Sequence, residues 1–513
     1  MLSALAVACA VAAAPASAQP WWQRDVVYEV FVRSYADSDG DGVGDLRGLT
    51  AHLDELKSLG VDDLWLMPIM PSPSDHGYDV VDETGVNPAY GTLADFDAFV
   101  RAAHARQMHV ILDFVLNHTS DQHPWFTGKN ARAYYVWKAQ PDARYRRPWD
   151  GASPWHAQDS AFYLGLFSAH MPDLNLDNDE VVAALIDAMK TWLGRGVDGF
   201  RLDAVRHLVE QERADGTVQM TDTEATHALL ARIHAELARV KPDVLLVGEA
   251  WADAQTVATY TPAAPAPAQL QLAFSFDVAQ GIVSAVRDGE RGPLVEALPA
   301  LTSSAAPFLT NHDQVRAMRA LSGDVDEAKL AAAILLALPG TPFLYYGEEI
   351  GLQGGAPSDD ENKRTPMRFT DVGPGFGFTR GAPWFRADER AGVDVVHERA
   401  DAKSLWRTYQ ALLAVHHQNA ALTSPALLRL RTDGGGRGTI ALLRGEPSVH
   451  QQRVLFVANL AHEGSAPFLL DLKAKALSVL ASSPGFAGLV SASDGVHVPA
   501  LAADGYAFVA VSE

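Results

Sequence analysis

Eight short apolar segments, most of them separated by segments with amphipathic helical periodicity, run through the greater part of the 513-residue sequence. The apolar segments span residues 26–32, 64–69, 110–115, 199–202, 245–247, 272–276, 308–309 and 343–346. Helical periodicity is clear at residues 53–59, 96–103 and 182–193. Eight strand–helix units over about 350 residues are typical of one architecture. The sequence therefore predicts an α/β fold, a (β/α)8 TIM barrel.

Two regions depart from this alternation. Residues 119–178, after the third predicted strand, are rich in Trp, Tyr, Pro and Asp and lack helical periodicity, which predicts an inserted small domain. From residue 421 onward, short apolar segments alternate with glycine turns, which predicts a C-terminal antiparallel β-sandwich. The predicted domains are a signal peptide at 1–18, the barrel at 19–118 and 179–420, the insert at 119–178 and the C-terminal domain at 421–513.

The first 18 residues form an Ala-rich apolar run that ends in Ala16-Ser17-Ala18. This pattern predicts a secretory signal cleaved before Gln19, although no Lys or Arg stands near its start. Polar residues follow at once, so we expect no membrane span and a secreted or periplasmic protein. The sole cysteine, Cys9, lies inside the signal and leaves a lipoprotein anchor as the alternative. Cleavage after Ala18 would exclude a disulfide or a thiol nucleophile.

The composition is acidic, with 41 Lys and Arg against 63 Asp and Glu and a formal net charge of -22. Nucleic acids and anionic membrane surfaces would be repelled by this charge, which disfavours both as partners. A neutral substrate is compatible with it, and carboxylates remain available for a hard cation. Much of the charge is also explained by solubility alone.

Polar clusters stand where five of the predicted strands end. They are His76–Asp79, Asp113–His118, Arg201–His207, Glu249–Trp251 and Asn311–Asp313. In a barrel, polar residues at the carboxyl ends of strands face the active site, whereas polar residues inside strands are buried at a cost. One buried Asp–Arg pair could be structural, but five clusters in register on successive strands predict one shared site.

An acidic loop with glycines follows the first predicted strand. Asp37, Asp39, Asp41 and Asp45 recur at nearly every second position, which suits a calcium site. An EF-hand is disfavoured because no Glu occupies the twelfth position. A solvated acidic turn is the alternative, but clustered carboxylates without a cation would repel each other.

The segments Asp113-Phe-Val-Leu-Asn-His118, Gly199-Phe-Arg-Leu-Asp203, Gly248-Glu-Ala-Trp251 and Thr310-Asn-His-Asp313 resemble the signature regions of the α-amylase family, glycoside hydrolase family 13, in family order. Met171-Pro-Asp-Leu-Asn175 resembles the group intermediate between oligo-1,6-glucosidases and neopullulanases. The resemblance runs from about residue 26 to 413. It implies a barrel with an inserted domain and a C-terminal β-sandwich, and a retaining glycoside hydrolase.

This resemblance implies that Asp203 is the nucleophile, Glu249 the general acid/base and Asp313 the third carboxylate, which holds sugar hydroxyls. Arg201, two residues before Asp203, points to the same side of the strand and should favour the ionised form of Asp203. Glu249 must hold a proton before it acts, so its pKa should be raised.

Further residues match positions of the family that bind sugars. Tyr78 matches the aromatic platform, His118 and His312 match histidines that hydrogen-bond the same sugar, and Arg206 and His207 match a pair that contacts leaving-group sugars. The complete predicted substrate-binding set is Tyr78, Asp79, His118, Arg201, Arg206, His207, Trp251 and His312.

The resemblance also implies Ca²⁺ as cofactor. One site would use the side chains of Asp37, Asp39, Asp41 and Asp45 and the carbonyl of Val43. A second would join the insert to the barrel through residues that match Asn117, Asp173 and the backbone of His207. Many α-glucosidase relatives lack that second ion.

Specificity rests on fewer residues. Ala204 follows the nucleophile, where dedicated α-1,6-glucosidases of the family usually carry Val, so the resemblance favours α-1,4 linkages. Asp79 resembles the exo-acting branch, where this Asp pairs with an Arg before the Arg-Thr-Pro-Met segment, but residues 359–361 are acidic here. We therefore expect an open cleft and an endo-acting α-amylase that cleaves starch and maltooligosaccharides as a monomer. The alternatives are an exo-acting α-glucosidase, a maltose-rearranging transglycosylase, and a non-catalytic binding protein, which the three retained carboxylates disfavour.

Overall fold

The computed structural model describes residues 20–512, except 357–358, 448, 450 and 451. The predicted signal peptide at 1–18, with Cys9, therefore lies outside the described residues. Within them, no helix has both the length and the apolar character to cross a membrane.

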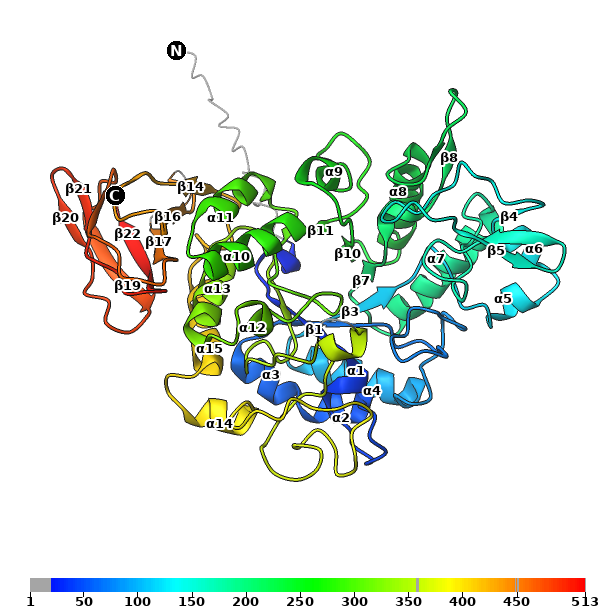
Figure 1. Cartoon of the computed structure of the whole chain (residues 1–513), viewed down its shortest axis with the longest axis horizontal. Helices are drawn as coiled ribbons and strands as arrows, with labels where there is room; N and C mark the ends of the chain where they lie inside the picture. Colours follow the sequence, from blue (N-terminus) through cyan, green and yellow to red (C-terminus); the bar gives the residue numbers. More distant parts are fainter. Residues whose placement is uncertain (1–19, 357–358, 448, 450–451, 513) are drawn as a thin grey trace, which may run out of the picture.

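Eight parallel strands form the central sheet (Figure 1). In chain order they are β1 (Val27–Val30), β2 (Asp63–Leu66), β3 (His109–Phe114), β7 (Gly199–Leu202), β10 (Leu245–Gly248), β11 (Leu272–Phe274), β12 (Ala305–Ala306) and β13 (Phe343–Tyr345). From β1 to β12 each strand pairs with the next of this set, and β13 returns to pair with β1. A single parallel bridge from Phe308 to Phe343 joins the last two segments, so the sheet is a nearly closed barrel, as predicted.

Alternation along the strands creates two cores. Val27, Trp65 and Ile111 belong to a cluster inside the barrel, whereas their neighbours Tyr28 and Leu64 pack in the layer between the barrel and its helices. Successive side chains of a strand point to opposite faces, so both faces of these strands are buried. The same alternation directs Glu29, Asp113 and Arg201 into the barrel, where charged groups are rare.

Two predicted strands differ in their limits. The prediction at 308–309 was wrong in position, because β12 occupies Ala305–Ala306 and Phe308 contributes only its bridge to Phe343. The segment predicted at 272–276 ends as a strand at Phe274, since Phe276 begins helix α10 (Phe276–Asp288). Both errors come from apolar runs that continue past the last ladder hydrogen bond.

The helices around the barrel agree with the predicted periodicity. α3 (Leu53–Leu59) matches its predicted segment, and the segments at 96–103 and 182–193 lie within α4 (Leu93–Ala105) and α7 (Asp179–Gly194). The remaining long helices are α8 (Glu224–Ala238), α13 (Val325–Ala337) and α15 (Leu405–Gln418). A capping box between Thr92 and Asp95 fixes the start of α4.

Residues 119–178 hold a three-stranded antiparallel sheet of β4 (Trp137–Lys138), β5 (Trp155–Gln158) and β6 (Ala161–Leu164). Its small core includes Tyr145 and Trp155 and is completed by Met220, which follows a hairpin of β8 (Gln211–Glu212) and β9 (Val218–Gln219). The sheet lies at the opposite side of the barrel from the C-terminal strands (Figure 1). Two distant segments thus build one lobe beside the carboxyl ends of the strands.

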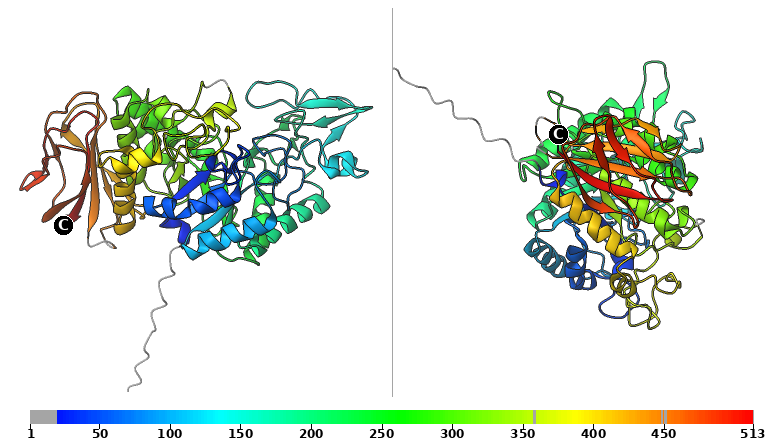
Figure 2. Two further views of the ribbon diagram at one scale, coloured as in Figure 1. Left: turned by 90° about the horizontal axis from the view of Figure 1, so that it is seen from below. Right: turned by 90° about the vertical axis from the view of Figure 1, so that its left-hand side faces the viewer.

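The C-terminal strands form two antiparallel sheets that pack face to face (Figure 2). The larger has the order β14 (Leu427–Arg429), β16 (Thr439–Arg444), β17 (Arg453–Asn459), β22 (Tyr506–Ser512) and β19 (Ala476–Ser482), and the smaller β15 (Thr432–Gly434), β18 (Phe468–Leu470), β21 (Gly495–Val498) and β20 (Val490–Ala492). The predicted β-sandwich is confirmed. The predicted boundary at 420/421 falls between α15 and β14, and the domain limits as such stay predictions.

Candidate active site

The guanidinium group of Arg201 on β7 lies at the centre of the site. Its side chain is 0% exposed. Nη1 contacts Asp203 Oδ1 at 2.7 Å and Asp113 Oδ1 at 3.0 Å, and Nη2 contacts Glu249 Oε2 at 2.6 Å. These carboxylates lie on or directly after the adjacent strands β7, β3 and β10. One buried cation therefore holds three acidic groups of neighbouring strands together.

The chain turns sharply after Asp203. Ala204 has a φ of 45°, in the left-handed region that a residue with a Cβ seldom adopts. In this conformation the backbone N–H of Ala204 donates to Glu249 Oε2 at 3.1 Å. Glu249 Oε2 thus accepts two hydrogen bonds, from Ala204 and Arg201, which leaves Oε1 to carry a proton.

Burial and the neighbouring charges separate the acidic groups. Burial, together with Asp203 and Asp313, raises the pKa of Glu249 to about 7, although Arg201 opposes the rise. Burial also raises the pKa of Asp203, and the favourable charge of Arg201 offsets only part of this effect. The predicted influence of Arg201 on Asp203 therefore has the expected sign, but burial outweighs it.

A second hydrogen-bonded chain runs beneath Asp313. His312 Nδ1 lies 2.6 Å from Glu29 Oε1, and its Nε2 lies 2.7 Å from Tyr78 Oη and 3.1 Å from Asp313 Oδ2. Burial would lower the pKa of His312, but Asp313 and Glu29 raise it to about 9. Burial would raise the pKa of Asp313, but His312, Arg364 and Arg201 hold it below its ordinary value. His312 is therefore a protonated support for an ionised Asp313 at neutral pH.

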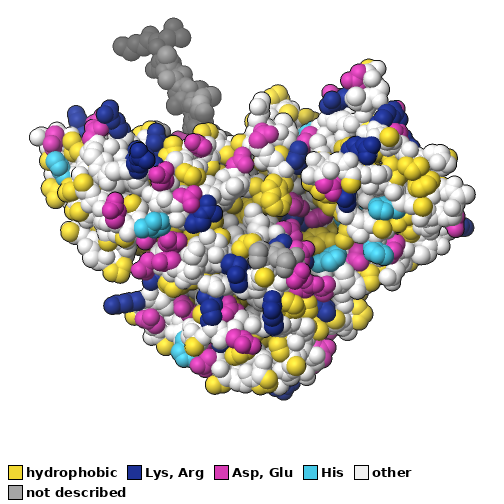
Figure 3. All heavy atoms as spheres, viewed as in Figure 1, with side chains coloured by type: hydrophobic (Ala, Val, Ile, Leu, Met, Phe, Trp, Pro, Cys, Tyr) yellow, Lys and Arg dark blue, Asp and Glu magenta, His cyan; other side chains and the backbone are white. Residues whose placement is uncertain are grey.

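These groups open onto a cleft of about 590 Å³ between the barrel and the insert. Figure 3 shows a hollow in this face where acidic and hydrophobic side chains lie side by side. Two tryptophans line the cleft with half of their surface exposed, Trp149 and Trp251, each at 52%. Trp251 stacks on Phe276 at a ring distance of 4.4 Å, and Trp149 stacks on Phe167 at 5.5 Å. Both rings are thus supported and present a face to the cleft.

The structure brings most of the predicted site residues to this cleft. Its lining includes the predicted residues Tyr78, His118, Asp203, Arg206, His207, Glu249, Trp251 and Asp313. Arg201 and His312 lie beneath it, each 0% exposed. His118 Nε2 is buried without a hydrogen-bond partner among the described residues, which suits a group that waits for a ligand hydroxyl.

Two of the predicted substrate-binding side chains form hydrogen bonds with other groups of the protein. Asp79 is buried and accepts hydrogen bonds from Ser72 Oγ at 2.5 Å and from Ser74 Oγ. Arg206 donates to Asp222 Oδ1 at 2.9 Å and Oδ2 at 2.6 Å, and also to the carbonyl oxygen of Trp251. Arg206 therefore fixes the loop that carries Trp251.

The acidic position expected before Arg364 also lies at the cleft. Asp360 and Arg364 both line it, and Arg364 Nη2 contacts Asp313 Oδ1 at 3.0 Å and Asp360 Oδ2 at 3.6 Å. Within the described part of the chain, Asp79 forms no ion pair with an arginine. The closing Asp–Arg pair of the exo-acting pattern is therefore not formed among these residues.

The acidic loop after β1 folds tightly around its own carboxylates. Asp37, Asp39 and Asp45 each place an oxygen within 4.8 Å of the others. Asp41 is not in this group, and its Oδ1 accepts from the N–H of Val43 at 2.8 Å. Gly42 has a φ of 96°, and a Cβ there would lie 2.2 Å from the carbonyl oxygen of Ala382. No Lys or Arg of the described residues pairs with the three clustered carboxylates, so a hard cation fits their charge.

A second acidic pair lies between the insert and the loop after β7. Asp173 Oδ2 and Glu210 Oε1 are buried with no hydrogen-bond partner among the described residues. Burial and the charge of Glu210 raise the pKa of Asp173 well above its ordinary value, and burial raises the pKa of Glu210 to about 7. Asn117 Nδ2 donates to the carbonyl oxygen of His207 at 2.6 Å beside them. Calcium prefers oxygen ligands, so the two carboxylates and the carbonyl oxygen of His207 suit it, and Asn117 would join them through Oδ1, which here contacts His118 Nδ1.

Sequence reasoning missed several of these groups. Glu210 carries no motif and is brought to Asp173 only by the fold, and Glu29 looks like an ordinary residue of an apolar strand. Trp149 and Phe167 lie in the irregular insert, where the abundance of aromatic residues was the available signal.

Comparison with known proteins gives consistent matches. Residues 29–425 match the family model described as the catalytic domain of alpha amylase. The chain is 35% identical to Alpha-amylase 3 of Dictyoglomus thermophilum over 89% of each chain, and 31% identical to an oligo-1,6-glucosidase of Parageobacillus thermoglucosidasius over 78% of this chain and 84% of the other. The crystal structure of an alpha-amylase from H. orenii superimposes with a TM-score of 0.82 at 33% identity, over 96% of this chain and 100% of that chain.

The charge on His312 gives a test of the site without substrate. Because its folded pKa of about 9 exceeds its ordinary value of 6.5, His312 stabilises the protein fully below pH 6.5 and loses this contribution as pH rises through 9. The melting temperature of wild type should therefore exceed that of His312→Gln most at about pH 6, and this difference should shrink by about pH 9.5. Scanning calorimetry at several pH values measures it.

The matched control is His416→Gln. His416 is also buried, but burial lowers its pKa to about 4, so it stays neutral throughout the tested range. Its difference from wild type should not shrink as pH rises to 9.5; it should change only below about pH 7, where the unfolded chain protonates His416, and in the opposite direction. A difference for His312→Gln that stays constant between about pH 7 and 9.5 would contradict the protonated support.

Proposed function

The chain belongs to the α-amylase family, and we propose that within it the protein is a retaining, endo-acting α-amylase that cleaves α-1,4-glucosidic bonds in starch and maltooligosaccharides. The observation that carries the hydrolytic part of this proposal is the pair Asp203 and Glu249, held by one guanidinium group at the floor of an open cleft.

The chemistry follows from the two carboxyl groups. Glu249, with its pKa raised to about 7, donates a proton to the glycosidic oxygen while Asp203 attacks the anomeric carbon. Glu249 then takes a proton from water, which cleaves the glycosyl–enzyme ester. Asp313, kept ionised by His312 and Arg364, accepts hydrogen bonds from the sugar hydroxyls and favours distortion of the ring. Tyr78 and His118 complete the sugar-binding wall.

Substitution of either carboxyl group tests these roles. Asp203→Asn and Glu249→Gln should each lower kcat by roughly three to six orders of magnitude, since each removes a group needed in both half-reactions. Because the acid must be protonated, kcat/KM of wild type should fall as pH rises above about 7. Initial rates on soluble starch or a chromogenic maltooligosaccharide measure both effects.

The control is Asp433→Asn, at an exposed carboxylate of the C-terminal domain, which should retain wild-type rates. Near-normal turnover by Asp203→Asn or Glu249→Gln would show that the roles are assigned wrongly. Circular dichroism spectra that match wild type exclude misfolding as the cause of lost activity.

The endo part of the proposal is supported by how the cleft ends. Exo-acting enzymes need a wall beyond the cleaved sugar, and the Asp–Arg pair of that pattern is replaced by Asp79 with Ser72 and Ser74. Arg364 instead contacts Asp313. Trp149 and Trp251 add exposed aromatic faces along the cleft, which suit stacking with several successive glucose units.

We therefore expect starch viscosity to fall early, while few reducing ends have formed, with maltose and longer oligosaccharides as products. Trp149→Ala should raise KM for long maltooligosaccharides about fivefold, because about 1 kcal/mol of stacking is lost, with a smaller effect on maltotriose. A time course on starch, maltotriose and maltose, resolved by chromatography, measures both.

The second candidate is an exo-acting α-glucosidase, which the similarity to an oligo-1,6-glucosidase favours. Release of glucose from the outset, little change in viscosity and a preference for maltose would support it against the endo proposal. Conversion of maltose into another disaccharide would instead indicate a maltose-rearranging transglycosylase.

We also propose calcium in two places. Asp37, Asp39 and Asp45 would hold one ion, and Asp173, Glu210, Asn117 and the carbonyl of His207 another. A calcium ion at either site would relieve the repulsion between buried or clustered carboxylates, so calcium should stabilise the folded protein.

Chelation should therefore lower the melting temperature, and added Ca²⁺ should restore it. Asp39→Asn and Glu210→Gln should each abolish one binding event in calorimetric titration with Ca²⁺. Asp41→Asn should leave both events intact, whereas loss of one would return Asp41 to the ligand set that the sequence predicts. An unchanged melting curve in excess chelator, with no metal in elemental analysis, would refute both sites.

We further propose export of the enzyme from the cytoplasm, on the basis of the signal-like sequence at residues 1–18. An external location also suits a polymeric substrate too large to be taken up intact.

A further inference from the structure

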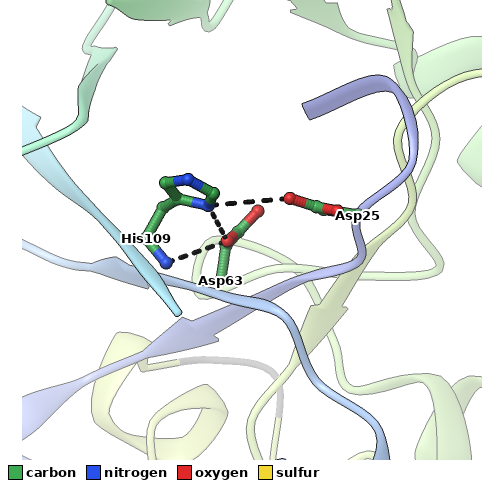
Figure 4. A group of neighbouring side chains, drawn as sticks. All are labelled: Asp25, Asp63 and His109. Atoms are coloured by element: carbon green, nitrogen blue, oxygen red, sulfur yellow. Dashed lines mark hydrogen bonds and ion pairs between the residues drawn. The ribbon is translucent and has the colours of Figure 1, made fainter. Parts of the chain in front are cut away.

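At the amino end of the barrel, opposite the catalytic cleft, three metal-binding side chains converge. Asp25 stands just before β1, and Asp63 and His109 are the first residues of β2 and β3. Asp63 is in register with His109 and with Val27, which follows Asp25 by two residues, so the three residues lie at the same end of adjacent strands. Figure 4 shows their side chains pointing toward one another.

The distances between these groups are short. His109 Nδ1 lies 2.7 Å from Asp63 Oδ1 and 3.6 Å from Asp25 Oδ2. One donor atom of each residue lies within 4.8 Å of the other two. Trp21 stacks on the imidazole ring at a centroid distance of 3.9 Å and so limits its rotation.

Asp63 supplies an independent sign that a ligand belongs here. Its side chain is 0% exposed, and its Oδ2 has no hydrogen-bond partner among the described residues. This free oxygen points into the space between the imidazole and Asp25 (Figure 4). A buried carboxylate oxygen without a partner costs stability unless a cation or a proton neutralises it.

The surrounding charges sharpen this need. Within the described part of the chain, neither Asp25 nor Asp63 forms an ion pair with Lys or Arg. The nearby lysines are used elsewhere, Lys57 by Asp62 and Lys241 by Asp198. A divalent cation would remove the repulsion between these carboxylates.

We propose that Asp25, Asp63 and His109 bind one divalent transition-metal cation, with Zn²⁺ as the best fit. One imidazole nitrogen and two carboxylate oxygens match the preferences of Zn²⁺, whereas Ca²⁺ and Mg²⁺ prefer all-oxygen sites. Water completes the coordination, since the side chains of Asp25 and His109 are 22% and 32% exposed. The cation ties the beginnings of β1, β2 and β3 together, at the end of a barrel where stability rather than catalysis is served.

A similar group elsewhere lacks the critical feature. Asp371, Asp394 and His397 also cluster, but both oxygens of Asp394 accept hydrogen bonds, from the N–H and Nδ1 of His397. The buried carboxylate of Asp394 therefore has no oxygen without a hydrogen-bond partner. This cluster therefore provides a matched control with the same residue types.

The test is calorimetric titration of Zn²⁺ into the full chain in saturating Ca²⁺, which keeps the calcium sites occupied. Wild type should show a binding event that His109→Gln and Asp25→Asn weaken at least about 100-fold, since even outer-shell changes cost roughly 10- to 100-fold. His397→Gln should retain it. Zn²⁺ should raise the melting temperature of wild type and of His397→Gln by a few degrees, but not that of the other two variants.

Equal Zn²⁺ affinity in wild type, His109→Gln and Asp25→Asn would overturn the proposal, as would a wild type that binds no Zn²⁺ below millimolar concentrations. The latter result would mean that Asp25 and Asp63 share a proton. Asp63→Asn is avoided because Asp63 also accepts the backbone N–H of His109 and the variant risks misfolding. Starch hydrolysis should be unchanged in His109→Gln and Asp25→Asn, which verifies that both variants fold.

Discussion

The guanidinium group of Arg201 lies fully buried inside the barrel and contacts the carboxylates of Asp113, Asp203 and Glu249. A buried charge is tolerated only when it is paired and hydrogen-bonded, and the removal of one partner is strongly destabilising. Here the opposite charges of the guanidinium group and the carboxylates offset the free-energy cost of burying each of them. Because the carboxylates come from three neighbouring strands, the alignment of those strands and the geometry of the site depend on the same contacts.

Different groups neutralise the buried carboxylates at the two ends of the barrel. At the carboxyl ends, Arg201, His312 and Arg364 provide positive charge, so Asp313 stays ionised while Glu249 retains a proton near neutral pH. At the amino ends, Asp25 and Asp63 have only the imidazole of His109 beside them among the described residues, and an external cation or a proton must supply the rest. The same strands therefore carry a reactive site and a stabilising one.

The shape of the cleft depends on segments outside the barrel strands. The insert contributes Trp149, and its core requires Met220 from beyond the hairpin β8–β9. Arg206 holds Asp222 and the carbonyl oxygen of Trp251, so one side chain fixes the hairpin end and the second aromatic face together. The cleft is thus shaped by loops that the barrel strands anchor, as is usual for this architecture.

The sequence by itself determined the barrel, the β-sandwich and the strand-end clusters. Hydrophobic periodicity and the spacing of segments are local properties that can be read along the chain. It misplaced β12, where apolar residues at 308–309 continue past the paired residues 305–306. Only the tertiary structure decided which acids meet. In the folded chain Glu210 lies beside Asp173, Glu29 beside His312 and Asp25 beside Asp63. Asp41 lies outside the group of Asp37, Asp39 and Asp45, and Asp79 accepts hydrogen bonds from serines. Burial and charge pairing depend on distances through space between residues far apart in the chain, and no local pattern records those distances.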